Sequence, residues 1–302
     1  MNTQGTMNRR GILTAAAGGL ALLMARPVLA AGTPKVLNIW PNQPPGGDAK
    51  VTVQEKITDN REKPDQPNKF VYGVRTPDLT LRYPEKPNGA AVLVLPGGAY
   101  TKVVLDKEGN EIAAWLTGEG YVTGVLKYRL PGDGWAAGLD TPGQDALRAL
   151  RLLRKVSGVN KVGVMGFSAG GHLAAVLGTR YADPLYDRID ATDDLSARPD
   201  FMALLYPALG LRALPGNMCY PVFDRVNAQT PPAFIAQAAD DKRVTPNNSL
   251  EMEARLVAAG VPAELHMFEA GGHGFALRTS PGDVWPGLFD TWEKTLIAPS
   301  KA

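Results

Sequence analysis

Ser168 stands between Gly166 and Gly170 in the stretch Gly-Phe-Ser-Ala-Gly, and this spacing is typical of a nucleophilic serine. The apolar residues 162–165 precede it and the helix-forming residues 171–177 follow it, which predicts a sharp turn from strand to helix. Glycines at both positions allow the strand and the helix to pass closely. The free amides and the dipole of the helix would favour negative charge beside the serine. The pattern therefore predicts a hydroxyl held clear of a sheet, although a glycine-softened turn is the simpler alternative.

A serine hydroxyl needs a base to remove its proton, and the chain has three histidines. His172 lies four residues after Ser168 on the expected helix, where packing beneath the turn is the favoured role. His266 lies inside an expected strand, away from its end. His273 follows that strand in Gly-Gly-His-Gly-Phe, and the glycines let this loop bend back over the sheet. His273 is therefore the expected general base.

Where a nucleophilic serine stands on such a strand-to-helix turn, the carboxylate that orients the imidazole follows the serine and precedes the histidine along the chain. The expected strand at residues 233–238 ends next to Asp240 and Asp241. Either aspartate could accept a hydrogen bond from His273, and the other would then be a solvated turn residue. Position along the chain does not decide whether Asp240 or Asp241 is the orienting acid.

Backbone amides must already point at the oxyanion that forms in such a reaction, and each is worth about 2.7–4 kcal/mol in the transition state. The residue after the nucleophile, Ala169, supplies one candidate amide. Gly98 and Ala99 supply others, because two glycines follow the expected strand at residues 91–95 and allow amides to face the site. An ordinary Gly-Gly turn is the alternative interpretation.

From residue 90 onward, short aliphatic runs alternate with segments of helical periodicity, which predicts an α/β fold with a mostly parallel sheet and helices on both faces. The expected strands are residues 91–95, 121–127, 161–165, 201–206, 233–238 and 263–268. The expected helices are residues 111–118, 144–156, the segment after Ser168, 247–259 and 283–297. Residues 51–53 and 79–81 are expected as leading strands at one edge, where an antiparallel orientation is allowed.

Residues 1–30 resemble an export signal peptide, so residues 31–302 are expected to form one catalytic domain. Arg9 and Arg10 precede an apolar run that is shorter than the about 20 residues of a membrane-spanning helix. This pattern favours twin-arginine over general export, with cleavage after Ala30 and a periplasmic or secreted product. A retained basic anchor and a start at Met7 are alternatives.

Loss of residues 1–30 removes three of the 32 basic residues and none of the 30 acidic ones, leaving 29 against 30. Such a balance of charges gives no excess positive potential that would attract nucleic acid or an anionic membrane. No stable membrane association is therefore expected after cleavage. The single cysteine cannot form an internal disulfide. No zinc-type cluster or spaced-glycine dinucleotide motif is present, so no metal or cofactor is expected. The oligomeric state is not indicated.

Six motifs occur in one order and together resemble the α/β-hydrolase esterases of the acetyl-xylan and feruloyl esterase-like group, often labelled xylanase or acetylesterase. The resemblance covers roughly residues 36–297. The motifs are residues 96–100, 127–130, 145–149, 166–172, 241–244 and 272–275.

This resemblance implies the α/β-hydrolase fold and the hydrolysis of carboxylic esters, commonly acetyl groups on plant-wall sugars, without metal or cofactor. In that family an Asp-x-x-Val step carries the acid, which implies Asp241 rather than Asp240. The expected activity is therefore a serine esterase that acts on acetylated carbohydrate or similar short-chain esters. A serine peptidase of the same fold and a non-catalytic binding protein are the alternatives, because one fold supports many functions.

Two departures from the family pattern bear on the site. Residues 208–230 form a shorter stretch than usual, which predicts a small lid and an open site and favours a bulky or polymer-borne ester. Ala99 stands where a third glycine is frequent, and its amide can still donate if its backbone angles permit.

Overall fold

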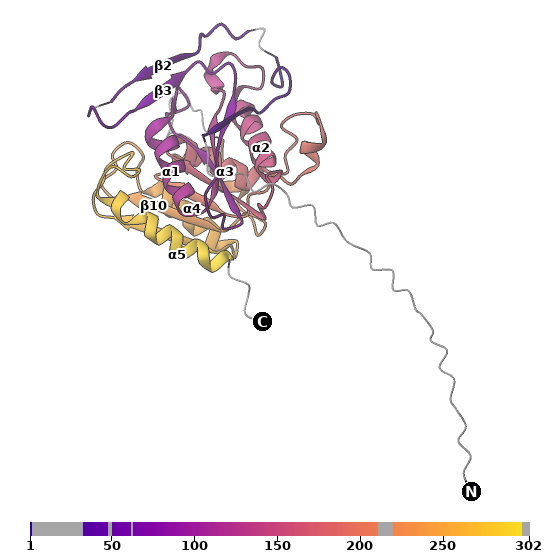
Figure 1. Cartoon of the computed structure of the whole chain (residues 1–302). Coiled ribbons are helices and arrows are strands. Elements are labelled where there is room, and N and C mark those ends of the chain that lie inside the picture. The colour runs from indigo at the N-terminus through magenta and orange to yellow at the C-terminus, as the bar shows by residue number, and fades with distance from the viewer. Residues whose placement is uncertain (2–32, 48–49, 62, 211–219, 298–302) are drawn as a thin grey trace.

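The computed structural model describes residues 1, 33–47, 50–61, 63–210 and 220–297 (Figure 1). Within these residues the main sheet has eight strands in the order β1-β4-β7-β5-β8-β9-β10-β11. In this order, the strands β7, β5, β8, β9, β10 and β11 run parallel to one another. At one end of the sheet, β4 pairs antiparallel with β7, and β1 pairs antiparallel with β4. The strands are β1 (Lys35–Asn38), β4 (Asp78–Arg82), β5 (Ala90–Leu95), β7 (Val122–Lys127), β8 (Lys161–Phe167), β9 (Met202–Leu205), β10 (Ala233–Ala238) and β11 (Ala263–Phe268).

A smaller antiparallel sheet contains β2 (Lys56–Asp59), β3 (Lys69–Tyr72) and β6 (Val103–Val104) (Figure 1). The strand expected at residues 79–81 is present within β4, but the strand expected at residues 51–53 is wrong. Side-chain donors from Arg75 bind the carbonyl oxygens of Val51 and Val53 at 2.9 and 3.5 Å. The guanidinium group of Arg75 therefore donates the hydrogen bonds that a neighbouring strand would otherwise donate to these carbonyls.

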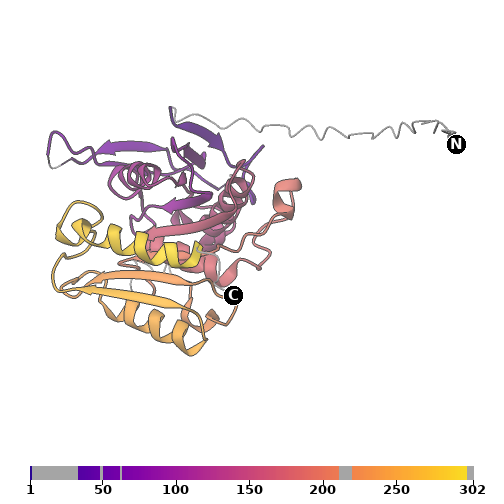
Figure 2. The same ribbon diagram turned by 60° about the horizontal axis from the view of Figure 1, so that its bottom comes forward.

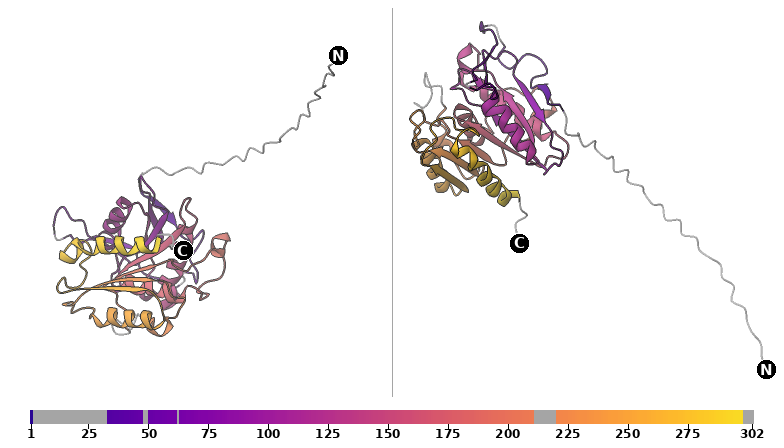
Figure 3. Two further views of the ribbon diagram at one scale, coloured as in Figure 1. Left: turned by 90° about the horizontal axis from the view of Figure 1, so that it is seen from below. Right: turned by 60° about the vertical axis from the view of Figure 1, so that its left-hand side comes forward.

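Helices cover both faces of the main sheet, as the alternation of elements predicted. They are α1 (Glu111–Gly118), α2 (Thr141–Arg154), α3 (Ala169–Arg180), α4 (Asn247–Ala258) and α5 (Trp285–Ile297). One core cluster contains side chains of α2, α3 and α4, and the other contains side chains of α1 and α5. Figure 2 shows α4 and α5 on opposite faces of β10 and β11, and Figure 3 shows the same arrangement from below.

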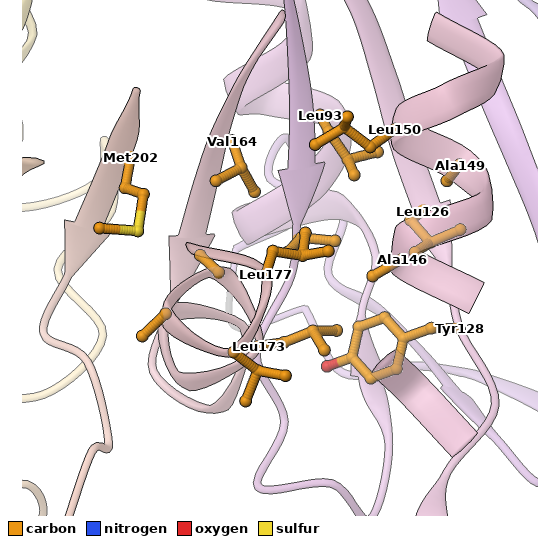
Figure 4. Packing of buried hydrophobic residues seen from close by; sticks show 14 of the residues in the cluster. Leu93, Leu126, Tyr128, Ala146, Ala149, Leu150, Val164, Leu173, Leu177 and Met202 are labelled. Atoms are coloured by element: carbon orange, nitrogen blue, oxygen red, sulfur yellow. The ribbon is translucent and has the colours of Figure 1, made fainter. Parts of the chain in front are cut away.

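The central strand β5 is buried along its whole length because both of its faces are covered. Leu93 points into the core with α2 and α3, whereas Val92 and Val94 belong to the core with α1 and α5. In Figure 4, Leu93 lies close to Leu150 of α2. Complete burial of such an aliphatic side chain stabilises the fold by about 1.5–3 kcal/mol.

Two helices begin at other residues than their periodicity indicated. Helix α2 begins at Thr141 instead of residue 144, because Pro142 suits the first turn of a helix through its restricted φ. Helix α5 begins at Trp285 instead of residue 283, after a short 3₁₀ turn at Ser280–Asp283.

The sheet brings the loops after β5, β8, β10 and β11 to one edge, at the carboxyl ends of parallel strands. The expected export segment falls outside the described residues except for Met1, and so do residues 211–219 of the expected lid. No helix in the described ranges is long and apolar enough to cross a membrane.

Candidate active site

Ser168 lies in the turn between β8 and α3. Its backbone φ is +53°, a value that residues other than glycine rarely adopt. A Cβ atom added to Gly166 would collide with the carbonyl of Gly170, and one added to Gly170 would collide with the carbonyl of Leu95. The two flanking glycines are therefore required by the close approach of strand, turn and helix. This turn leaves the side chain of Ser168 at the carboxyl ends of the parallel strands, within reach of the loops after β10 and β11.

A continuous pair of hydrogen bonds joins Ser168, His273 and Asp241. Oγ of Ser168 lies 2.9 Å from Nε2 of His273, and Nδ1 of His273 lies 2.7 Å from Oδ2 of Asp241. The side chain of Asp241 is fully buried, whereas that of His273 is 14% exposed. The structure thus brings together three residues that lie far apart in the sequence, in the order of contacts that a nucleophile, a base and an orienting acid require.

Asp241 accepts more than one hydrogen bond. Its Oδ1 atom accepts from the amides of Arg243 and Val244, both at 2.9 Å, and its Oδ2 atom also accepts from Nε2 of Gln237 at 3.2 Å. Burial by itself raises the pKa of Asp241, but the hydrogen bonds with His273 and with the two amides outweigh it and leave the pKa below its ordinary value. The group is therefore a carboxylate at neutral pH.

The neighbouring Asp240 is exposed and makes a different contact. Its Oδ1 atom accepts the amide hydrogen of Gly272 at 2.8 Å, one residue before His273. The structure places Asp241 against the imidazole and Asp240 against the backbone of the same loop.

The loop after β5 has positive φ values at Gly98 (+127°) and Ala99 (+55°). A Cβ atom at Gly98 would collide with the carbonyl of Lys102, and one at Gly97 would lie 3.0 Å from Cβ of Ser168. This loop therefore packs directly against the serine turn. Within the described residues the amides of Gly98 and Ala99 have no acceptor, and Ala169 is the first residue of α3, where an amide has no partner in its own helix.

The other two histidines have partners of their own. His172 is buried, with Nδ1 2.8 Å from the hydroxyl of Tyr100 and Nε2 3.0 Å from the carbonyl oxygen of Tyr220. Burial lowers the pKa of His172 to about 4, so its imidazole is neutral. His266 contacts Glu264 at 2.6 Å within β11. Both observations agree with the packing role expected for His172 and the mid-strand position expected for His266.

The comparison with solved structures identifies the fold. The acetyl ester-xyloside bifunctional hydrolase from Caldicellulosiruptor lactoaceticus superposes with a TM-score of 0.67 and 28% identity, over 87% of this chain and 96% of that one. This chain is an α/β-hydrolase. The carboxylesterase Cest-2923 from Lactobacillus plantarum shares the fold with a TM-score of 0.64 and 22% identity, over 82% of this chain and all of that one.

Sequence comparisons confirm the resemblance of this α/β-hydrolase to the acetyl-xylan and feruloyl esterase-like group. The BD-FAE family matches residues 78–201, and the prolyl oligopeptidase family matches residues 217–284. An acetylxylan esterase of Xylanibacter ruminicola is 30% identical over 72% of this chain and 48% of its own length. Endo-1,4-beta-xylanase B of Butyrivibrio fibrisolvens is 30% identical over 68% of this chain and 36% of its own length. The α/β-hydrolase thus spans about half or less of these relatives.

Two residues of the α/β-hydrolase lie at the site without having been indicated by the sequence. Tyr206 follows β9, and its ring meets that of His273 edge-on with centroids 5.2 Å apart. Glu108 is buried and receives a hydrogen bond from the hydroxyl of Tyr206 at 2.9 Å. Tyr206 could have been predicted as a site residue from its position at the end of a strand. Glu108 could not, because it follows no long strand and belongs to no motif. The described residues contain no group of three or more His, Cys, Asp or Glu side chains that could hold a metal ion.

Proposed function

We propose that this α/β-hydrolase is a serine esterase that hydrolyses carboxylic esters through an acyl-enzyme. The observation that carries the proposal is the continuous hydrogen-bond chain from Ser168 through His273 to Asp241. A hydroxyl in such a chain can lose its proton as it attacks, because the base is already within hydrogen-bond distance.

In the first half-reaction, Oγ of Ser168 attacks the ester carbonyl while Nε2 of His273 takes its proton. Asp241 stabilises the resulting imidazolium and keeps the ring oriented. The amides of Gly98, Ala99 and Ala169 donate to the oxyanion. His273 then returns the proton to the leaving alcohol as the carbon–oxygen bond breaks.

In the second half-reaction, His273 removes a proton from water, which attacks the acyl group on Ser168. The tetrahedral intermediate uses the same amides, and collapse transfers the proton back to Oγ and releases the acid.

Replacement of Ser168 tests this mechanism. Ser168→Ala removes the nucleophile but keeps the fold, and we expect kcat for nitrophenyl acetate to fall by about 10⁴-fold or more. Near-normal hydrolysis by the folded variant would remove Ser168 from the mechanism.

We propose acetylated carbohydrate as the substrate class, because the relatives include an acetylxylan esterase and an acetyl ester-xyloside hydrolase. Acetate release from acetylated xylan should be compared with release from nitrophenyl acetate and from feruloylated sugars. Preference for a feruloyl ester over both acetyl esters would contradict an acetyl-specific role while leaving the esterase mechanism intact.

A serine peptidase is the second candidate, since the prolyl oligopeptidase family matches residues 217–284, which contain both Asp241 and His273. A chromogenic dipeptide distinguishes the two activities, and we expect its turnover to be far below that of nitrophenyl acetate. A non-catalytic binding protein is distinguished by an organophosphate probe, which should label wild type and spare Ser168→Ala.

We further propose that residues 1–30 export the enzyme to the periplasm or the medium and are then cleaved after Ala30, on the pattern of Arg9, Arg10 and the short apolar run. Sequencing the amino terminus of exported protein tests the cleavage site. Export that is unaffected by replacing both arginines with lysine would favour the general pathway.

A further inference from the structure

Glu108 is a buried carboxylate for which the proposed mechanism has no step. It is 5% exposed and lies in a π-helical turn, Asp106–Asn110, between β6 and α1. Both of its oxygen atoms accept hydrogen bonds: Oε2 from the amide of Gly97 at 2.8 Å, and Oε1 from the hydroxyl of Tyr206 at 2.9 Å. Such π-helical turns occur often at functional sites, and burial of a carboxylate is costly unless its partners compensate.

Through Tyr206, Glu108 reaches the loop that carries the base. The ring of Tyr206 packs edge-on against His273, and against Phe275 at 4.6 Å between centroids. Burial and the nearby charge of Glu108 raise the pKa of Tyr206 far above its ordinary value, so the hydroxyl stays protonated and donates a hydrogen bond to Oε1 of Glu108.

Through Gly97, Glu108 reaches the loop that carries two candidate oxyanion donors. Gly97 lies against the serine turn and directly precedes Gly98. The preceding carbonyl, of Pro96, is bound by the hydroxyl of Tyr128 at 2.6 Å. These two bonds hold the Pro96–Gly97 peptide from both sides. The carbonyl of Gly97, which shares a peptide unit with the amide of Gly98, accepts from the amide of Val104 at 3.0 Å. Together these bonds constrain the direction in which the amide of Gly98 points.

We propose that Glu108 is a positioning residue that holds the oxyanion loop and the histidine loop together around Ser168. This inference rests on the proposed serine-esterase function. A carboxylate suits the task because both of its oxygens accept, whereas a glutamine has one acceptor and would require the hydroxyl of Tyr206 to reverse from donor to acceptor. Misplacement of reacting groups by about 1 Å can cost about 100-fold in rate, so loosening either loop should act on catalysis.

Two substitutions test the proposal: Glu108→Gln and the milder Tyr206→Phe, which keeps the ring and removes only the hydroxyl. We expect each to lower kcat for nitrophenyl acetate by about 10- to 100-fold while KM changes by less than about threefold. The double variant should be little worse than Glu108→Gln alone, because both substitutions break the same connection. The affinity of a boronic acid that forms a tetrahedral adduct with serine should fall in parallel with kcat/KM.

The chain supplies a matched control in the pair Tyr121 and Glu293. The hydroxyl of Tyr121 donates to Oε2 of Glu293 at 2.7 Å, and both residues are buried near the amino end of β7, at the opposite edge of the sheet. Tyr121→Phe leaves the buried carboxyl of Glu293 without this donor and should lower the melting temperature. Both Tyr121→Phe and Glu293→Gln should leave kcat within about twofold of wild type.

Equal kcat losses in Glu108→Gln and Glu293→Gln would overturn the proposal, as would an effect confined to KM. Ser168→Ala keeps this outcome separate from the mechanism itself. If Ser168→Ala is inactive while Glu108→Gln and Tyr206→Phe keep full kcat, the esterase function stands and the role of Glu108 alone fails.

Discussion

At the scale of single residues, the adjacent aspartates Asp240 and Asp241 have different contacts and therefore different expected roles. Both carboxylates contact the histidine loop, but Asp241 is buried against the imidazole and Asp240 is exposed against the amide of Gly272. Asp241→Asn should lower kcat by about 10⁴-fold, because an amide can leave His273 in the wrong tautomer. Asp240→Asn should cost less than about tenfold, since an amide oxygen can still accept from Gly272. Steady-state kinetics with nitrophenyl acetate compare them, and equal losses would contradict the assignment.

His172 gives a pH dependence of stability at the same scale. Its pKa is about 4 in the folded protein against an ordinary value of 6.5. Between these values the unfolded chain binds the proton and the folded one does not, so stability is complete above about pH 6.5 and falls as the pH drops towards 4, by about 3 kcal/mol. Urea unfolding at several pH values measures this loss. His172→Gln should flatten the profile in that range, and parallel profiles for both proteins would refute the assignment.

At the scale of elements, the turn from β8 to α3 depends on glycines that admit no side chain. A Cβ at Gly170 would meet the backbone carbonyl of Leu95, which cannot move without disturbing β5. Gly170→Ala should therefore destabilise the protein by about 3 kcal/mol or more. Gly118 at the end of α1 is the control, because an added Cβ meets nothing within 4 Å and alanine favours a helix by up to about 1 kcal/mol. Urea midpoints should move in opposite directions, and a shared direction would contradict this account.

At the scale of the whole molecule, a buried ion pair connects three distant segments. Asp145 of α2 accepts from Arg129 after β7 and from Nε1 of Trp40 at 2.7 Å, and the side chains of the ion pair are fully buried. Asp145→Ala leaves an unpaired buried guanidinium and should cost about 3–5 kcal/mol in unfolding free energy. The exposed pair of Arg188 and Asp194 is the control, and Asp194→Ala should cost less than about 1 kcal/mol. Similar losses in thermal unfolding would show that burial is not the deciding factor.

Much of the architecture and the candidate site follow from local patterns in the sequence. The expected bounds of α1, β10 and β11 agree with the structure, because hydrophobic periodicity reports burial within each segment. Glycine spacing indicates Ser168, and the position after an expected strand indicates His273; both properties are local. Parallel strands then place their carboxyl ends at one edge, so the convergence of these residues could also be anticipated.

Tertiary contacts decided the rest. Residue types and order left Asp240 and Asp241 open, and the motif resemblance favoured Asp241; only the folded loops show which carboxylate meets the imidazole. The β-branched residues 51–53 predict a strand, but in the structure Arg75 supplies donors to the carbonyls of Val51 and Val53. The contact of Tyr206 with Glu108 joins residues 98 positions apart and leaves no periodic signal in either segment. Hydrogen-bond partners between distant segments depend on how the elements pack, and that information is absent from any short stretch of the chain.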